Sequence, residues 1–181
     1  MNRMIVLSLF AALVFVQLAV PTGMILRREA ALRNGQEFKI RVQPVDPYDA
    51  FRGRYVQLGF NVTAAALPAG VQLTRPRSVY AVLETDPSGY AAVKSISLTT
   101  PSGAAYLSVR VFPYSSGSAR VVWPFDRYYM EENAAPEAER VYRERVQKSE
   151  AYITVRVANG TGVITGLYID GKPIEEMLRN R

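Results

Sequence analysis

The acidic segment FDRYYMEE (125–132) carries the side chains best suited to acid–base chemistry in this sequence. A pair of carboxylates can cleave a glycosidic bond, with one acting as the acid and the other as the nucleophile or base. Glu131 and Glu132 are adjacent, so they point to opposite faces of an extended chain and make a poor pair with each other. Either would need Asp46 or Asp49 as its partner. We therefore predict a solvated acidic loop here, and keep a carboxylate-dependent hydrolase or a binding protein for envelope glycans as the alternative function.

The absence of two residue types narrows the chemistry further. The 181 residues include no His and no Cys. Without His, the chain lacks the commonest general base near neutral pH. Without Cys, it lacks thiol nucleophiles and thiolate metal ligands. We therefore predict no catalytic residues, no metal site and no cofactor, and we favour a function that is not enzymatic.

The sequence is basic, with 22 Lys and Arg against 16 Asp and Glu and a net charge of +6. Its basic residues between positions 27 and 54 are scattered among acids rather than gathered in a tract. Such a distribution does not indicate a nucleic-acid partner. Next to an apolar segment, attraction to anionic lipid headgroups is the simpler interpretation.

The apolar segment is MIVLSLFAALVFVQLAVPTGMIL (4–26), which contains no charged residue. About 20 apolar residues are enough for a helix to span the hydrocarbon core of a bilayer. Arg27 and Arg28 follow as stop signals that can reach the headgroups. The alternative is a cleavable signal peptide, but this run is longer than the apolar part of such peptides and lacks a clear small-x-small cleavage site. We predict an uncleaved signal anchor over 1–27, in the cytoplasmic (inner) membrane.

The orientation of this anchor depends on two signals that disagree. Positive charges after the apolar run outnumber those before it, which by the positive-inside rule would keep residues 28–181 in the cytoplasm. That rule carries little weight when one flank is only residues 1–3. The body, rich in Tyr, Ser, Thr and Gly, is typical of an exported β domain. We therefore predict that 28–181 forms a single compact domain outside the cytoplasm.

The body alternates between apolar and polar residues in the manner of β-strands. Asn159-Gly160 is typical of a tight hairpin turn and predicts a hairpin over 151–173. Within the body a helix is predicted over 135–149, where Pro136 suits the first turn. Together these elements predict an α+β domain with mainly antiparallel strands. The remaining predicted strands are 37–45, 54–62, 78–84, 91–99, 105–113 and 118–125.

The connection DPYDAFRG (46–53) joins the first two predicted strands. Asp46 and Pro47 form a turn initiator, and Gly53 supplies a permissive backbone before the next strand. The simplest interpretation is a turn whose acids bond the nearby arginines. The sharper interpretation is a polar recognition site. Its candidate residues are Asp46, Pro47, Asp49, Arg52, Gly53, Tyr55 and Leu58, with Tyr129, Glu131 and Glu132 as secondary candidates.

The stretch DPYDAFRGRYVQLGF resembles the signature of the GDYXXLXY protein family. Gly53, Tyr55 and Leu58 match the pattern in register, whereas Arg54 stands where the family has Asp and Phe60 where it has Tyr. The segments RYYMEE and GLYIDGKP also look like the family. Because Arg54 reverses the charge, a role for the family carboxylate is not carried over to this chain.

The resemblance, with its motif at 53–60, implies a small bacterial protein with one N-terminal hydrophobic segment and a domain without an assigned activity. Such proteins are often found beside a multi-spanning membrane protein, and the resemblance gives no catalytic residue to transfer. We therefore predict a membrane-anchored accessory or interaction protein that acts with an integral membrane partner.

Overall fold

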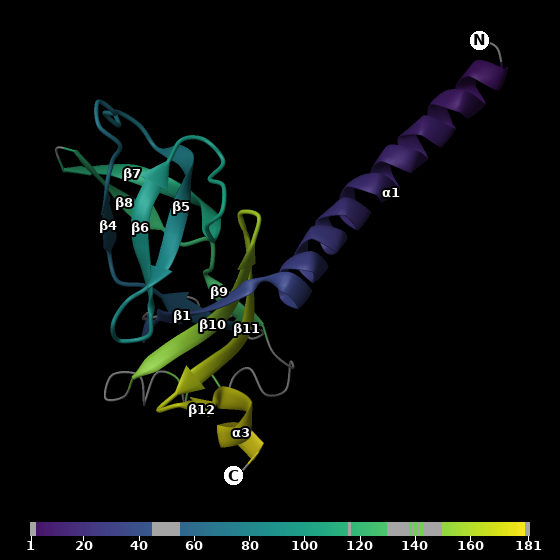
Figure 1. Ribbon diagram of the computed structural model, residues 1–181. Coiled ribbons are helices and arrows are strands. Elements are labelled where there is room, and N and C mark those ends of the chain that lie inside the picture. Colours follow the sequence, from purple (N-terminus) through teal and green to yellow (C-terminus); the bar gives the residue numbers. More distant parts are fainter. Residues whose placement is uncertain are drawn as a thin grey trace.

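Figure 1 shows the computed structural model of the chain, in which a long N-terminal helix projects from a body of β-strands. The structure describes residues 3–44, 55–115, 117–129 and 150–179, together with Ala138, Arg140 and Tyr142. Every pair of named strands in this described part is antiparallel. The predicted fold class, one N-terminal helix followed by a mainly antiparallel α+β body, is confirmed.

Helix α1 (Arg3–Asn34) is longer than the apolar run, since it continues past residue 26 through two more turns that contain charged residues. Almost all apolar side chains of residues 4–26 are exposed, on every side of the helix, whereas Ala31 in the later turns is buried. A helix that is apolar all round requires an apolar medium or a large protein core around it. By length and composition, α1 is the one helix among the described residues that could cross a membrane.

The helix passes into the first strand with a single residue between them. Helix α1 ends at Asn34, and strand β1 (Gln36–Arg41) begins directly after Gly35. The Gly35 amide donates a hydrogen bond of 2.9 Å to the carbonyl of Ala31, which closes the last turn. The chain therefore has no flexible linker between α1 and the body.

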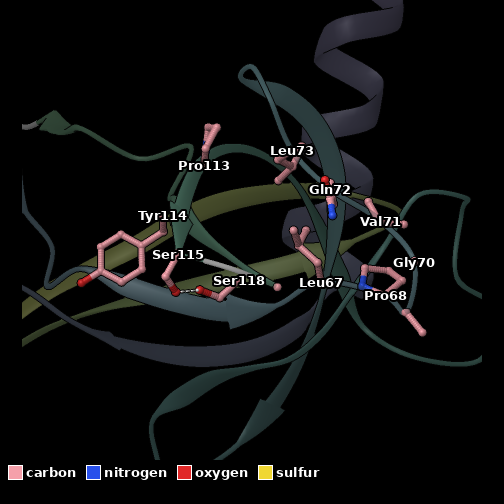
Figure 2. Close-up of a pocket in the computed structure, with 12 residues that line it drawn as sticks. Leu67, Pro68, Gly70, Val71, Gln72, Leu73, Pro113, Tyr114, Ser115 and Ser118 are labelled. Carbon is pink, nitrogen blue, oxygen red and sulfur yellow. Dashed lines mark hydrogen bonds between the residues drawn. The ribbon is translucent and has the colours of Figure 1, made fainter.

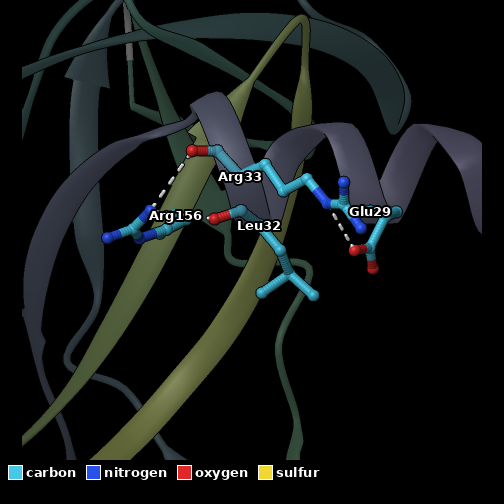
Figure 3. A network of polar contacts seen from close by, with 4 residues as sticks. All are labelled: Glu29, Leu32, Arg33 and Arg156. Atoms are coloured by element: carbon cyan, nitrogen blue, oxygen red, sulfur yellow. Dashed lines mark hydrogen bonds and ion pairs between the residues drawn. The ribbon is translucent and has the colours of Figure 1, made fainter.

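A side chain of the body completes the end of the helix. Figure 3 shows Arg156, whose Nη1 donates to the carbonyl oxygens of Leu32 (2.9 Å) and Arg33 (3.4 Å). These carbonyls belong to the last turn, which has no intrahelical donors for them, and a cation here complements the negative end of the helix dipole. Glu37 lies 3.8 Å from Arg156 Nε, and Glu29 accepts a 2.7 Å bond from Arg33. The Arg156 bonds fix α1 to the body, whereas the Glu29–Arg33 pair lies within the helix.

The C-terminal hairpin forms most of a four-stranded sheet in the order β1-β10-β11-β12. Its other strands are β10 (Ala151–Ala158), β11 (Thr161–Ile169) and β12 (Lys172–Pro173). Asn159 and Gly160 have φ angles of 48° and 79°. Positive φ at both positions is what a two-residue type I′ turn requires. The predicted hairpin over Asn159-Gly160 is thus confirmed.

A five-stranded sheet in the order β4-β8-β7-β5-β6 forms the other half of the body. The turn between β5 and β6 has the sequence DPSG (86–89), and in it the Gly89 amide donates to the Asp86 carbonyl at 2.9 Å. The Asp86 carboxylate also accepts from the amides of Ser88 and Tyr90, so the side chain holds the turn as Asp commonly does. The strands are β4 (Thr63–Ala66), β5 (Arg77–Thr85), β6 (Ala91–Ser97), β7 (Tyr106–Ser115) and β8 (Ser118–Val122).

A small ladder in the order β2-β3-β9 lies where the two larger sheets meet (Figure 1). It contains β2 (Gln43–Pro44), β3 (Tyr55–Gly59) and β9 (Arg127–Tyr129). The predicted strand 54–62 is therefore too long, because β3 ends at Gly59 and the chain enters the five-stranded sheet only at Thr63. The short helix α3 (Ile174–Arg179) follows β12.

Buried side chains from these ladders form a common hydrophobic core. Phe38 of β1, Val56 of β3, Val109 of β7 and Ile153 of β10 all belong to it. The inward positions alternate with exposed ones, as half-buried strands require.

The predicted helix 135–149 lies mainly outside the described residues. Within it, Ala138, Arg140 and Tyr142 are helical. Ala138 and Tyr142 are buried in the core.

Candidate functional site

Strand β3 carries the described part of the motif, and it pairs with β9, which comes from the acidic segment 125–132. The register places Tyr55 opposite Tyr129 and Gln57 opposite Arg127. The two tyrosine rings lie 5.9 Å apart with an angle of 60° between their planes. The Arg127 guanidinium lies 4.7 Å from the centroid of the Tyr55 ring, within the range of a cation–π interaction. We call Tyr55, Arg127 and Tyr129 the motif surface.

The alternation of β3 determines where each motif side chain points. Val56 and Leu58 are buried in the core, whereas Tyr55 is partly exposed. The Leu58 amide donates to the carbonyl of Asp126 at 2.9 Å, which continues the ladder beyond β9. Leu58 is therefore a core residue, whereas Tyr55 and Gln57 lie on the outward face of β3.

Strand β3 is also held at its other end. The Tyr142 hydroxyl donates to the carbonyl oxygen of Gln43 at 2.8 Å, and Gln43 pairs with Gly59 of β3. Burial raises the pKa of Tyr142, so the hydroxyl keeps the proton that it donates.

The motif surface combines an exposed aromatic ring with a permanent positive charge. Tyr129 is 66% exposed. Contact with the Tyr129 hydroxyl, followed by the influence of Tyr55 and Asp126, raises the pKa of Arg127 above its already high ordinary value. Tyr and Arg side chains are enriched among the residues that contribute most to protein–protein binding. This composition therefore suits an interaction surface better than a catalytic centre.

A hollow of about 380 Å³ adjoins the motif surface. Its walls come from β9, from Gly162 and its neighbours on β11, and from Arg28 of α1. Asp126 also lines it, and its Oδ2 lies 3.4 Å from the Nε of Arg127. The lining thus has two guanidinium groups, Arg28 and Arg127, against one carboxylate, so the hollow favours an acidic group.

The middle residue of β9 connects this site to the C-terminal helix. The Tyr128 hydroxyl donates a hydrogen bond to the Glu175 carboxylate of α3. Burial and then this bond raise the pKa of Tyr128. The contact is between a neutral donor and a charged acceptor, and it fixes the side of β9 that faces away from the motif surface.

The structure brings together two of the residues selected from the sequence, Tyr55 and Tyr129. Arg127 was not selected, although the single basic residue within the acidic, tyrosine-rich segment was a possible signal for it. The candidates that lie outside the described residues are Asp46, Pro47, Asp49, Arg52, Gly53, Glu131 and Glu132.

Comparison with protein families adds an independent line of evidence. The family model described as "GDYXXLXY protein" matches residues 17–167. The chain belongs to the GDYXXLXY family. The match begins within the apolar part of α1 and ends in β11, so the family pattern includes the second half of the apolar run, the motif strand and β9. Neither the comparison with curated proteins nor that with solved structures found a match.

A second hollow, of about 600 Å³, lies at the end of the five-stranded sheet (Figure 2). The loop after β4, residues 67–73, lines one side, and the β7–β8 turn lines the other. Figure 2 shows the hydroxyls of Ser115 and Ser118 bonded to each other, with Tyr114 extending beyond them. Its lining residues carry no charge, so it offers less to a specific ligand than the hollow at the motif surface.

A cluster of charged and aromatic side chains joins the turn before β6 to the four-stranded sheet. The Arg41 guanidinium lies 3.8 Å from the centroid of the Tyr90 ring and also faces Asp86 (3.7 Å) and Glu150 (3.6 Å). Tyr152 packs edge-on against Tyr90 with ring centroids 5.9 Å apart. Since its members satisfy one another, we interpret this cluster as a structural contact between the two sheets.

Replacing Tyr90 by Phe should reduce the loss of stability at alkaline pH. Burial, and then a hydrogen bond to Glu150, raises the pKa of Tyr90 from 10.0 to about 12. Between these values the unfolded chain releases the proton while the folded protein keeps it, so the free energy of unfolding falls as the pH rises. Denaturant titrations of the full chain in detergent at several pH values should show a shallower fall for Tyr90→Phe. A slope equal to that of the wild type would contradict the raised pKa.

Proposed function

We propose that this protein is a membrane-anchored accessory protein that acts with an integral membrane partner, and that the partner binds the motif surface. In this proposal, α1 anchors the chain in the cytoplasmic (inner) membrane as a single span. The β body lies outside the cytoplasm, where a short basic N-terminus and an exported type of composition favour it.

The observation that carries this proposal is the position of the motif surface beside the anchor. Arg28 lies two residues after the end of the uncharged run of α1, and it lines the same hollow as Arg127 and Tyr129. With α1 across a bilayer, Arg28 would lie at the level of the headgroups. A binding site next to Arg28 is then at the membrane surface. Such a location favours a partner that is itself embedded in the membrane.

The chemistry of the surface indicates what the partner presents. The exposed Tyr129 ring offers apolar area at a small cost in conformational entropy, and Arg127 offers a planar guanidinium fork. Because the guanidinium groups outnumber the carboxylate in the hollow, an acidic segment in a loop of the partner is the most complementary ligand.

Two single-cysteine variants test this proposal with a matched control. The chain has no Cys, so Tyr129→Cys and Tyr114→Cys each introduce the only thiol. The two tyrosines are similarly exposed, at 66% and 60%, but only Tyr129 belongs to the motif surface. In intact cells, a maleimide that cannot cross the inner membrane should label both variants. A benzophenone maleimide should then crosslink position 129, and not position 114, to an integral membrane protein.

Each of the three parts of the proposal, which are the location of the body, the binding site and the anchor, has a result that would contradict it. Labelling only after lysis would place the body in the cytoplasm. Equal crosslinking at both positions would remove the motif surface as the binding site. Loss of the full-length chain from the membrane fraction would reject the anchor.

A further inference from the structure

Gln17 is the one residue of the uncharged run 4–26 that has a side-chain amide. It lies near the middle of this run, so in a spanning helix it would be deep in the hydrocarbon core. The Gln17 side chain is exposed, and it has no hydrogen-bond partner within the part of the chain that the structure describes. In hydrocarbon, a polar side chain without a hydrogen-bond partner raises the free energy of the protein.

Pro21, one turn later, adds a second polar group at the same place. It lies inside α1. Proline has no N–H, so the carbonyl of Gln17 lacks the donor that residue 21 would normally supply. The turn from Gln17 to Pro21 thus presents an amide side chain and a carbonyl in need of a donor. Between transmembrane helices, such groups are satisfied by hydrogen bonds to a neighbouring helix.

This polar turn faces the same side of α1 as the motif surface. Gln17 and Arg28 are 11 residues apart, which at 3.6 residues per turn places them about 20° from each other around the helix. Arg28 lines the hollow at the motif surface. Ala31 is fully buried and lies on this side too, about 40° from Gln17. One face of α1 therefore leads from Gln17, through Arg28, to the site proposed for the partner.

We infer that the turn Gln17–Pro21 is a docking site for a transmembrane helix of the integral membrane partner. That helix supplies a side chain with an N–H or O–H group at the depth of Gln17. This group donates a hydrogen bond to the backbone carbonyl of Gln17 or exchanges hydrogen bonds with the Gln17 side-chain amide. The inference rests on the proposed function, since it requires α1 to span the membrane. It goes further by placing part of the interface within the bilayer and by specifying the chemistry of the partner helix.

A second copy of this chain fits the same turn less well. Two parallel copies that met through Gln17 would each direct the body side of α1 toward the other. Figure 1 shows that the body projects to one side of the helix, and Ala31 is buried on that side. The two bodies would then compete for the same space. A helix from a partner with short loops has no such conflict.

Two phenylalanines of the anchor allow a test that distinguishes the faces of the helix. Phe10 lies about 20° from Gln17 around the helix, and Phe15 lies about 160° from it. Photo-crosslinking benzoylphenylalanine at position 10 of the full chain, in cells, should give an adduct with a multi-spanning protein, whereas position 15 should give adducts with lipid. Gln17→Leu should lower the yield at position 10 by about three- to thirtyfold, as expected for an interhelical hydrogen bond. Mapping of the crosslinked peptide should identify a helix with a polar donor.

A matched control uses the opposite face of the same run. Ser8 lies about 180° from Gln17, so Ser8→Leu also replaces a polar residue by leucine but should leave the yield at position 10 unchanged. Equal yields at positions 10 and 15, no effect of Gln17→Leu, or adducts with twice the mass of the chain would overturn the inference while full-length protein stays in the membrane. Absence of the wild-type chain from the membrane would instead reject the proposed function.

Discussion

Replacing Gly35 by Ala is expected to disrupt the junction between α1 and the body. A Cβ at this position would collide with the carbonyl oxygen of Ala31 and would lie 2.9 Å from the backbone N of Val157. Both are backbone atoms, and Val157 is held in the β1–β10 ladder, so neither can move without loss of hydrogen bonds. We expect the free energy of unfolding to fall by about 1–3 kcal/mol, as for other overpacked sites.

Thermal and denaturant unfolding of the full chain in detergent would measure this loss. Gly23→Ala is the matched control, because Gly23 lies inside α1 and nothing lies within 4 Å of the Cβ that the substitution would add. Alanine is also a better helix former than glycine, so this control should be neutral or slightly stabilising. A similar loss for both substitutions would show that the close contact at Gly35 is not the cause.

The consequence for function follows from the position of Gly35. In the proposed function α1 spans a membrane, and because no linker follows it, the direction of α1 would determine how the motif surface faces that membrane. A shifted junction would separate Arg28 from β9 and open the hollow that they share. The Gly35→Ala variant should therefore also reduce partner crosslinking at position 129, even though this substitution is outside the motif surface.

The elements with local signals were predictable from the sequence. The uncharged run gave the long helix, and Asn159-Gly160 gave the hairpin, since a type I′ turn needs residues that tolerate positive φ. Alternation located most strands. It could not locate the end of β3, because Phe60 and Val62 continue the apolar pattern although Val62 is 60% exposed.

The pairing of strands was not predictable in the same way. Strand β1 pairs with β10, so Gln36 lies opposite Val157, and β3 pairs with β9, so Tyr55 lies opposite Tyr129. Such contacts depend on the whole core and leave no mark in a short stretch of residues. Tyr55 and Tyr129 were therefore selected for separate reasons, and only the fold unites them with Arg127.

Replacing Leu107 by Ala is expected to cause a large loss of stability in the body. Leu107 is fully buried on β7, and it forms an isolated bridge with Gly160 at the tip of the β10–β11 hairpin. The neighbouring amide of Ser108 donates to the Gly160 carbonyl at 2.9 Å. Leu107 thus packs where the five-stranded sheet meets the four-stranded one. Truncation of a buried Leu costs about 2–5 kcal/mol, depending on how far the cavity can collapse.

Val122→Ala on β8 is a suitable control for this substitution, because Val122 is 41% exposed. Substitutions at exposed positions usually change the free energy of unfolding by less than about 0.5 kcal/mol.

The effect of Leu107→Ala should extend to the motif surface, since Leu107 and Phe125 both pack against Gly162, and Phe125 lies two residues before Arg127. Near-ultraviolet circular dichroism should therefore lose part of its aromatic signal in Leu107→Ala and keep it in Val122→Ala. If the Leu107 variant kept both its stability and its aromatic signal, the two sheets would not share a core at this point. The motif surface would then depend on the three-residue β3–β9 ladder, on the Tyr142 bond to Gln43 and on the Tyr128 bond to Glu175, without packing from the five-stranded sheet.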